Sequence, residues 1–188
     1  MALNPFPLPA IEPGAGFACW SESIELVTST APEFIDLTEQ VESIIARSPV
    51  TEGLAVVFSR HTTAAITLNE LEPLLLEDMA EFLDKLAPRS HCYRHNDFDV
   101  RTVNMTPDES PNGHAHCLQL ILGASQTIPI RDGRLSLGQW QRIFMVELDR
   151  SRPREAVVQT FGVSRPVRPA AVVGRRNGNG SRARVREV

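Results

Sequence analysis

The sequence predicts an α+β fold in a single domain, with a mixed or antiparallel sheet and two main helices. Strand-like and helix-like segments follow one another irregularly rather than in strict alternation, which argues against a doubly wound parallel sheet. An Asp-Gly pair at residues 132–133 separates two apolar segments, as in a hairpin of antiparallel strands. The 188 residues, 42% of them hydrophobic and 22% charged, are enough for one domain with a real core.

The first 70 residues predict three strands and one helix. Residues 23–28 are typical of a strand, and residues 36–47 of an amphipathic helix that Pro49 ends. Residues 53–59 contain the apolar sequence LAVVF of a buried strand, and residues 63–68 form a second strand. The apolar residues of the helix recur at helical spacing: Leu37, Val41, Ile44 and Ile45.

A second helix is expected at residues 72–86. Pro73 suits its first turn, and Pro88 follows just beyond its end. Its predicted apolar face comprises Leu75, Leu76, Met79, Phe82, Leu83 and Leu86. Residues 88–113 are polar and lack periodicity, and a segment of this length inside a domain is uncommon unless it is functional. Beyond it the sequence predicts a helix at 116–122 and strands near 125–130, 140–148 and 155–162.

The two ends of the chain differ from the middle in composition. Residues 1–16 are rich in proline and glycine, and we expect an extended arm there. Residues 165–188 carry seven arginines and a single acidic residue without apolar periodicity, so a disordered basic tail is expected. The folded domain is therefore predicted at residues 17–164. The net charge of −4 argues against a nucleic-acid binder, although the tail leaves contact with RNA or acidic partners open.

The sequence favours a cytoplasmic protein. The N-terminal residues have neither the basic start nor the continuous apolar segment of a secretory signal. No segment approaches the roughly 20 apolar residues that a membrane span needs, so no membrane partner is expected. The three cysteines are irregularly spaced, which is typical of free thiols in a reducing compartment.

Histidines give the main indication of chemistry. His61 lies between two predicted strands, and the other four lie between residues 91 and 116: His91, His95, His114 and His116. Three imidazoles from separate segments, with an open fourth position, would suit a catalytic zinc ion. The spacing matches no standard metal motif, so hydrogen-bonded structural histidines remain the alternative.

Two further motifs combine polar side chains with strands. Asn69 and Glu70 end the segment HTTAAITLNE, where the carboxylate could be a general base or could orient a histidine ligand. The alternative is a carboxylate favoured by the dipole of the helix that follows. Trp140 and Gln141 could stack on a flat ring and bind its edge, or Trp140 could be a core residue.

Five segments together resemble the YjbQ-type family, also called secondary thiamine-phosphate synthases. They are HTTAAITLNE at 61–70, EDM at 77–79, YRHND at 93–97, PNGHAHCLQLILGASQTIPIRDGRLSLGQWQ at 111–141, and the strand reaching Glu147. Their order and spacing agree over roughly residues 20–163. One departure is Glu72 before Pro73, where the family often has Asp.

The resemblance implies a compact α+β fold, a homotrimer and a divalent metal, with zinc suited to histidine ligands. The metal-site candidates are His61, His95 and His116. The matching polar pocket residues, which are candidates for catalysis, are Asn69, Glu70, Asn112 and Glu147. The candidates for contacting the ligand are Trp140, Gln141 and Arg131.

The implied reaction joins a pyrimidine diphosphate to a thiazole phosphate and gives thiamine phosphate. It needs a cation for the departing diphosphate and donors for its oxygens, for which Arg101, Arg131 and Arg134 are available. The chain lacks a glycine-rich phosphate loop. A metal-dependent hydrolase of a small substrate, with or without a phosphate group, and a non-catalytic metal- or ligand-binding protein are the alternatives.

Overall fold

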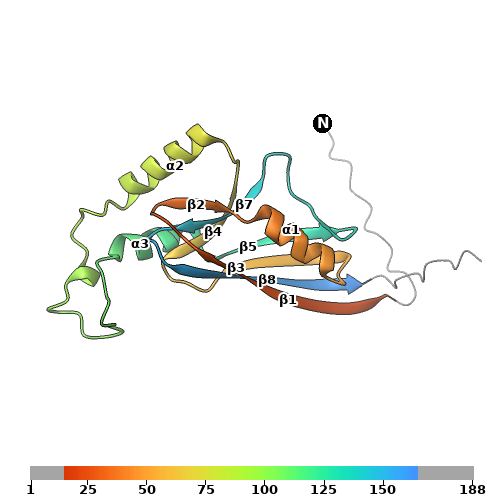
Figure 1. Ribbon diagram of the computed structural model, residues 1–188, viewed down its shortest axis with the longest axis horizontal. Helices are drawn as coiled ribbons and strands as arrows, with labels where there is room; N and C mark the ends of the chain where they lie inside the picture. Colours follow the sequence, from red (N-terminus) through yellow and green to blue (C-terminus); the bar gives the residue numbers. More distant parts are fainter. Residues whose placement is uncertain (1–14, 165–188) are drawn as a thin grey trace, which may run out of the picture.

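The computed structural model describes residues 15–164, which form two antiparallel sheets and three α-helices (Figure 1). The larger sheet has the strand order β1 (Gly16–Val27), β8 (Pro153–Ser164), β3 (Glu52–Ser59), β5 (Ser125–Arg131) and β6 (Arg134–Leu135). The smaller sheet has the order β2 (Glu33–Asp36), β7 (Arg142–Glu147) and β4 (Ala64–Asn69). The predicted α+β class is confirmed. The predicted tail and residues 1–14 of the predicted arm lie outside the described residues.

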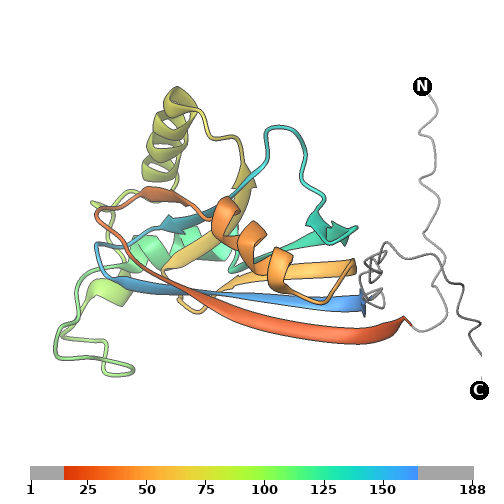
Figure 2. The same ribbon diagram turned by 45° about the vertical axis from the view of Figure 1, so that its right-hand side comes forward.

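Helix α1 (Thr38–Arg47) covers the inner face of the larger sheet (Figures 1 and 2). Its four predicted apolar residues are all buried in the main core, together with Val57, Ile128 and Met145. Residue Asp36 sets the start of this helix, because its Oδ1 accepts hydrogen bonds from the main-chain N–H and the hydroxyl of Thr38. The helix therefore begins two residues later than predicted, and Asp36 instead ends the short edge strand β2, which the sequence did not reveal.

Helix α3 (Gly113–Leu122) builds a second core against the smaller sheet. Ala115 and Leu118 are buried there beside Ala65 and Phe144. The helix begins before the predicted residue 116, and a short 3-10 helix, η1 (Arg94–Asn96), lies in the polar segment that precedes it.

Helix α2 (Pro73–Leu86) has the predicted bounds within one residue but not the predicted environment. The carboxylate of Glu72 caps its first turn by accepting hydrogen bonds from the N–H groups of Leu74 and Leu75. Leu83 is buried, whereas Phe82 is 63% exposed and Leu86 is 45% exposed. The predicted apolar face is therefore only partly buried within this chain, and α2 projects from the sheets in Figures 1 and 2.

The strand register decides which residues share an end of the molecule. Glu147, the last residue of β7, pairs with Ala64 and with Glu33, and Pro153 at the start of β8 pairs with Val27. The end of β3 and the polar segment around η1 lie at this same end (Figure 2). At the other end lies the β5–β6 hairpin, whose predicted Asp-Gly turn is confirmed by positive φ angles of 49° and 70°. No helix of residues 15–164 combines the length and the apolarity that crossing a membrane requires.

Candidate functional site

A cavity of about 880 Å³ opens at the end of the molecule where β3 and β7 finish. Three segments line it: residues 61–63 between β3 and β4, residues 95–116 from η1 to the first turn of α3, and residues 150–154 at the start of β8. These segments are far apart in the sequence, and the two antiparallel sheets bring them together. The lining carries three histidines and four arginines, so it is unusually rich in nitrogen donors.

His95 and His116 meet on the wall of this cavity. The centroids of the two rings are 4.6 Å apart, with the planes inclined by 67°. Nε2 of His95 is buried and has no hydrogen-bond partner. Burial lowers the pKa of His116, and the neighbouring His95 and Arg101 lower it further. Two of the three predicted metal ligands are therefore in contact, and His116 presents a neutral ring near neutral pH.

His61, which follows β3 and is distant from the other two histidines in the sequence, lines the same cavity. Its Nε2 accepts a 2.8 Å hydrogen bond from the main-chain N–H of Glu155. Burial lowers the pKa of His61, with a further contribution from the charge of Arg154. Since the neutral ring accepts at Nε2, its proton lies on Nδ1. In this arrangement His61 offers a hydrogen-bond donor rather than a lone pair.

Of the three histidines predicted to bind a metal ion, the structure brings two into contact and places the third on the same cavity lining. His95 and His116 are adjacent, but residues 15–164 contain no group of three or more His, Cys, Asp or Glu side chains placed to hold a metal ion. The ligand type of the pair suits zinc, because both rings are imidazoles and one has an unpaired buried nitrogen, but a catalytic zinc site takes three protein ligands.

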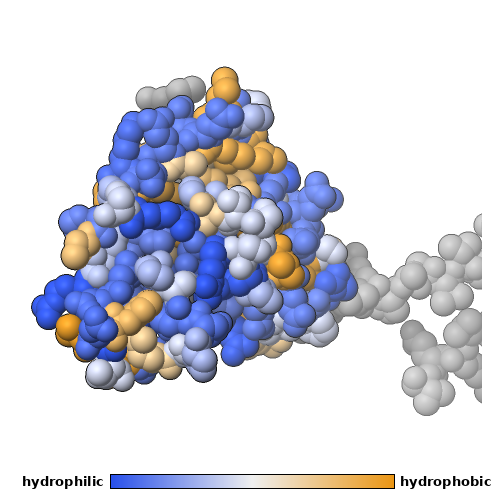
Figure 3. Space-filling view, turned by 60° about the vertical axis from the view of Figure 1, so that its left-hand side comes forward, coloured by the Kyte–Doolittle hydropathy of each residue, from blue (hydrophilic) through white to orange (hydrophobic). Residues whose placement is uncertain are grey.

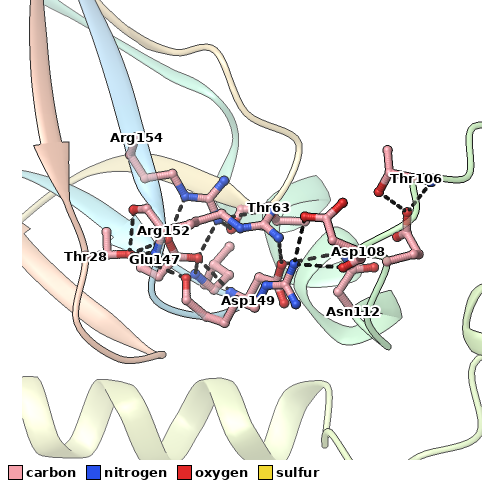
Figure 4. A network of polar contacts seen from close by, with 12 residues as sticks. Thr28, Thr63, Thr106, Asp108, Asn112, Glu147, Asp149, Arg152 and Arg154 are labelled. Carbon is pink, nitrogen blue, oxygen red and sulfur yellow. Dashed lines mark hydrogen bonds and ion pairs between the residues drawn. The ribbon is translucent and has the colours of Figure 1, made fainter.

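Glu147 lies behind the cavity wall rather than on it. Its side chain is fully buried and forms two hydrogen bonds with the guanidinium of Arg154 (Figure 4). The N–H groups of Leu148 and Asp149 and the hydroxyl of Thr28 also donate to this carboxylate. Burial alone would raise the pKa of Glu147, but these hydrogen bonds outweigh it and lower the pKa. The carboxylate therefore holds β7, β8 and β1 together at the site.

Arg150 and Arg152 are less completely paired than Arg154. Arg152 is 3.4 Å from the carboxylate of Asp149, and Arg150 is 3.9 Å from that of Asp108 and donates a 3.2 Å hydrogen bond to the Asp108 carbonyl. Both side chains remain about one third exposed, and each guanidinium has five N–H donors. Sequence reasoning missed this pair, although residues 150–154 read RSRPR. Both residues precede β8, so no strand periodicity marks them, and the only sequence signal is the local density of arginines.

The other predicted site residues divide between the two ends of the molecule. Asn112 lines the cavity as the N-cap of α3. Asn69 pairs with Arg142 at the opposite end of the smaller sheet, and Glu70 follows it. Trp140 and Gln141 immediately precede β7 and are exposed, and Arg131 lies in the β5–β6 hairpin. A six-residue strand is about 20 Å long, so within one chain these residues do not reach the cavity.

Comparison with known proteins places the chain among uncharacterised relatives. The family model described as UPF0047 protein YjbQ-like matches residues 22–163. A UPF0047 protein of Methanothermobacter thermautotrophicus is 36% identical over 149 residues, which cover 79% of this chain and 96% of the relative. The UPF0047 protein YugU of Bacillus subtilis is 32% identical, with 75% of this chain and 98% of the relative covered.

Solved structures give the same result for the fold. A YbjQ-like protein of unknown function from Sulfolobus solfataricus superposes with a TM-score of 0.71 at 34% identity, covering 78% of this chain and 99% of that one. A hypothetical protein from Aeropyrum pernix superposes with a TM-score of 0.66 at 37% identity, covering 76% and 98%.

Proposed function

This chain belongs to the family of YjbQ-like UPF0047 proteins, and on that premise we propose that its large cavity is the active site of an enzyme for a small phosphorylated substrate. One observation carries the proposal: histidines whose pKa is lowered and arginines with spare donors line a single cavity. Neutral imidazoles can accept or transfer a proton or bind a metal ion, and guanidinium groups bind phosphate oxygens.

The phosphate-binding part of the site is assigned to Arg150 and Arg152. Arg154 is committed to Glu147, and Arg101 is bound to Glu109 at 3.2 Å and to the carbonyl of Asn104 at 2.9 Å. The ion pairs of Arg150 and Arg152 are longer and more exposed, so a phosphate can approach them at a smaller cost in broken contacts. His61 adds an N–H donor on the same lining.

A divalent metal ion, with zinc the first candidate, would be held by His95 and His116. When bound, such an ion would polarise a phosphoryl oxygen and stabilise charge on the departing group. Glu147 and Arg154 keep the strand ends of the site rigid without taking part themselves. The assignment of His61 as a third ligand requires its proton to move from Nδ1, which would break the hydrogen bond from Glu155.

The particular reaction follows from the resemblance and is the finer part of the proposal. Thiamine-phosphate synthesis requires a diphosphate site, which the arginines support, and an aromatic surface for the pyrimidine. Trp140 does not lie on the cavity of its own chain, so that surface would have to come from another subunit. Hydrolysis of a phosphate ester needs no such surface and is the second candidate.

One set of assays separates these reactions. Purified protein without a histidine tag is supplied with the pyrimidine diphosphate and the thiazole phosphate, and thiamine phosphate and released phosphate are both measured. Thiamine phosphate supports the synthase, phosphate released without thiamine phosphate supports the hydrolase, and binding without turnover indicates a ligand-binding protein. A protein that neither binds nor converts any phosphate compound would refute the proposed site.

A homotrimer is also proposed, and the exposed apolar residues of α2 and α3 support it. Leu74 is 67% exposed, Leu120 is 81% exposed and Ile121 is 62% exposed. Figure 3 shows hydrophobic residues gathered at the top of one face, above a mainly hydrophilic surface. Exposed apolar residues clustered in this way are typical of subunit interfaces. A neighbouring subunit covering them could also supply the missing aromatic surface.

A further inference from the structure

Asn112 occupies the N-cap of α3 but does not cap it. An asparagine in this position usually accepts a hydrogen bond from an N–H of the first turn. Here the Asn112 side chain makes no such bond. Oδ1 of Asn96, in η1, instead accepts hydrogen bonds from the N–H groups of Asn112 at 3.0 Å and Gly113 at 2.9 Å. A second asparagine thus binds the start of the helix and leaves the Asn112 amide available.

The orientation of that amide is fixed. Asn112 is 6% exposed, and its Nδ2 donates a 3.5 Å hydrogen bond to Oδ2 of Asp149. A carboxylate accepts but does not donate, so turning the amide over would place two oxygens against each other. Oδ1 of Asn112 is therefore the group left over, and it is buried without a hydrogen-bond partner in the described part of the chain.

Two more buried atoms without partners belong to residues on the same cavity lining, Nε2 of His95 and Oγ of Ser110. A buried acceptor without a donor destabilises the folded protein, so such groups are rarely retained without a ligand or a water molecule to satisfy them. Three of them on one lining mark a polar subsite.

This subsite adjoins the proposed phosphate site. Nη2 of Arg152 lies 3.4 Å from Oδ2 of Asp149, the same oxygen that Asn112 contacts (Figure 4). The guanidinium and the amide therefore lie on either side of this oxygen. A phosphate bound to Arg152 thereby places the next few atoms of its ester beside Asn112. The atom that meets Oδ1 must carry a hydrogen.

We propose that Asn112 is a specificity-determining residue that accepts a hydrogen bond from an amino or hydroxyl group of the phosphorylated substrate. The inference rests on the proposed function, because Arg152 is taken to bind the phosphate. A site built around such a bond discriminates strongly against an analogue that lacks the donor, since the protein acceptor is then left buried and unpaired.

The test compares small phosphate esters by calorimetry on the full chain. Aminoethyl phosphate and hydroxyethyl phosphate carry a donor, and ethyl phosphate does not. We expect the donor-bearing esters to bind about tenfold or more tightly than ethyl phosphate. Asn112→Leu should abolish this preference, so that all three esters bind with similar affinity.

Two further variants make the result specific. Asn104 lines the same cavity with φ of 55°, which glycine also adopts, so Asn104→Gly removes an amide without backbone strain and should keep the preference. Asn112→Ala removes the acceptor without adding bulk or charge, and it should also lose the preference if the leucine variant does not fold. Equal binding of all three esters by the wild-type protein, or a folded alanine variant that keeps the preference, would overturn the inference alone. Failure of all three to bind would overturn the proposed function with it.

Discussion

The main-chain N–H of Glu155 donates a 2.8 Å hydrogen bond to Nε2 of His61, and this contact fixes what His61 can do. The bond ties the ring to the start of β8, next to the buried Arg154. Because Nε2 is the acceptor, Nδ1 carries the proton of the neutral ring. His61 is thereby prepared to donate to a ligand, whereas His95 retains an unpaired ring nitrogen.

We expect nitrogen NMR near neutral pH to show His61 with a protonated Nδ1 and a bare Nε2. The exposed His91 ring, which is not on the cavity, provides the reference for an unconstrained mixture of tautomers. A protonated Nε2 at His61 would contradict the assignment and would return this residue to the list of metal ligands.

Folding stability should fall on acidification. The pKa values of His61, His114 and His116 are all lowered, with burial as the largest cause. Below the ordinary histidine pKa of about 6.5 the unfolded chain therefore binds more protons than the native chain. The stabilisation is present above this pH and is lost as the pH falls towards the lowered native pKa values. Denaturant unfolding across this range measures the slope, and His114→Gln should reduce it; a slope of the opposite sign would be inconsistent with neutral buried rings.

Breaking the Arg154–Glu147 pair should destabilise the fold strongly. Both side chains are buried, and removing one leaves the charge of the other uncompensated, at a cost of about 3–5 kcal/mol. Arg154→Met is the test, measured by denaturant unfolding. The matched control is Arg60→Met, which breaks the exposed pair with Glu155 and should cost only about 0–1 kcal/mol. Equal losses in the two variants would show that the buried pair is not the anchor described.

Metal content should depend on His116. His116→Ala removes one of the two adjacent imidazoles, so we expect elemental analysis of untagged protein to show most of the bound zinc lost, with unfolding temperature little changed. His91→Ala removes an exposed imidazole away from the cavity and should retain the metal. A His116 variant with full metal content would place the ion elsewhere.

Assembly should depend on α2. Phe82 is 63% exposed in the single chain, and Phe82→Glu would place a charge in the proposed subunit interface. We expect light scattering to give a trimer for the wild-type protein and a smaller species for this variant. Glu77→Ala, also on the exposed surface of α2, is the control. A wild-type monomer at micromolar concentration would remove the basis for the trimer.

Local signals in the sequence were sufficient for most elements. Proline positions bounded α2, helical spacing identified the buried side of α1, and the Asp-Gly pair identified the β5–β6 turn. Strand β2 was missed because four residues are too few for periodicity and because Asp36 resembles the start of a helix. The exposure of α2 could not be predicted. An apolar helix face indicates that something covers it, but not whether the cover comes from the same chain or from another subunit.

The candidate site was predictable only in part. Motif resemblance connected His95 with His116, which the structure places in contact. It also grouped Trp140 and Glu70 with them, but these lie at the far end of the sheet within one chain. The roles of Asn112 and Glu147 depend on which neighbours hold each oxygen, and such relationships arise only after distant segments have packed.

Oδ1 of Asn96 accepts hydrogen bonds from the N–H groups at the start of α3. The polar segment around η1 and the first turn of α3 should therefore become ordered, or open, together. Gly113 strengthens the link, since a side-chain carbon there would lie 2.6 Å from Cβ of Tyr93. If the segment around η1 detaches, the first turn of α3 loses the acceptor that Asn96 provides, and His116 loses its contact with His95. The amides of Asn112 and Gly113 should therefore exchange with deuterium together with those of η1, as one cooperative unit that opens more readily than the β1–β8 ladder.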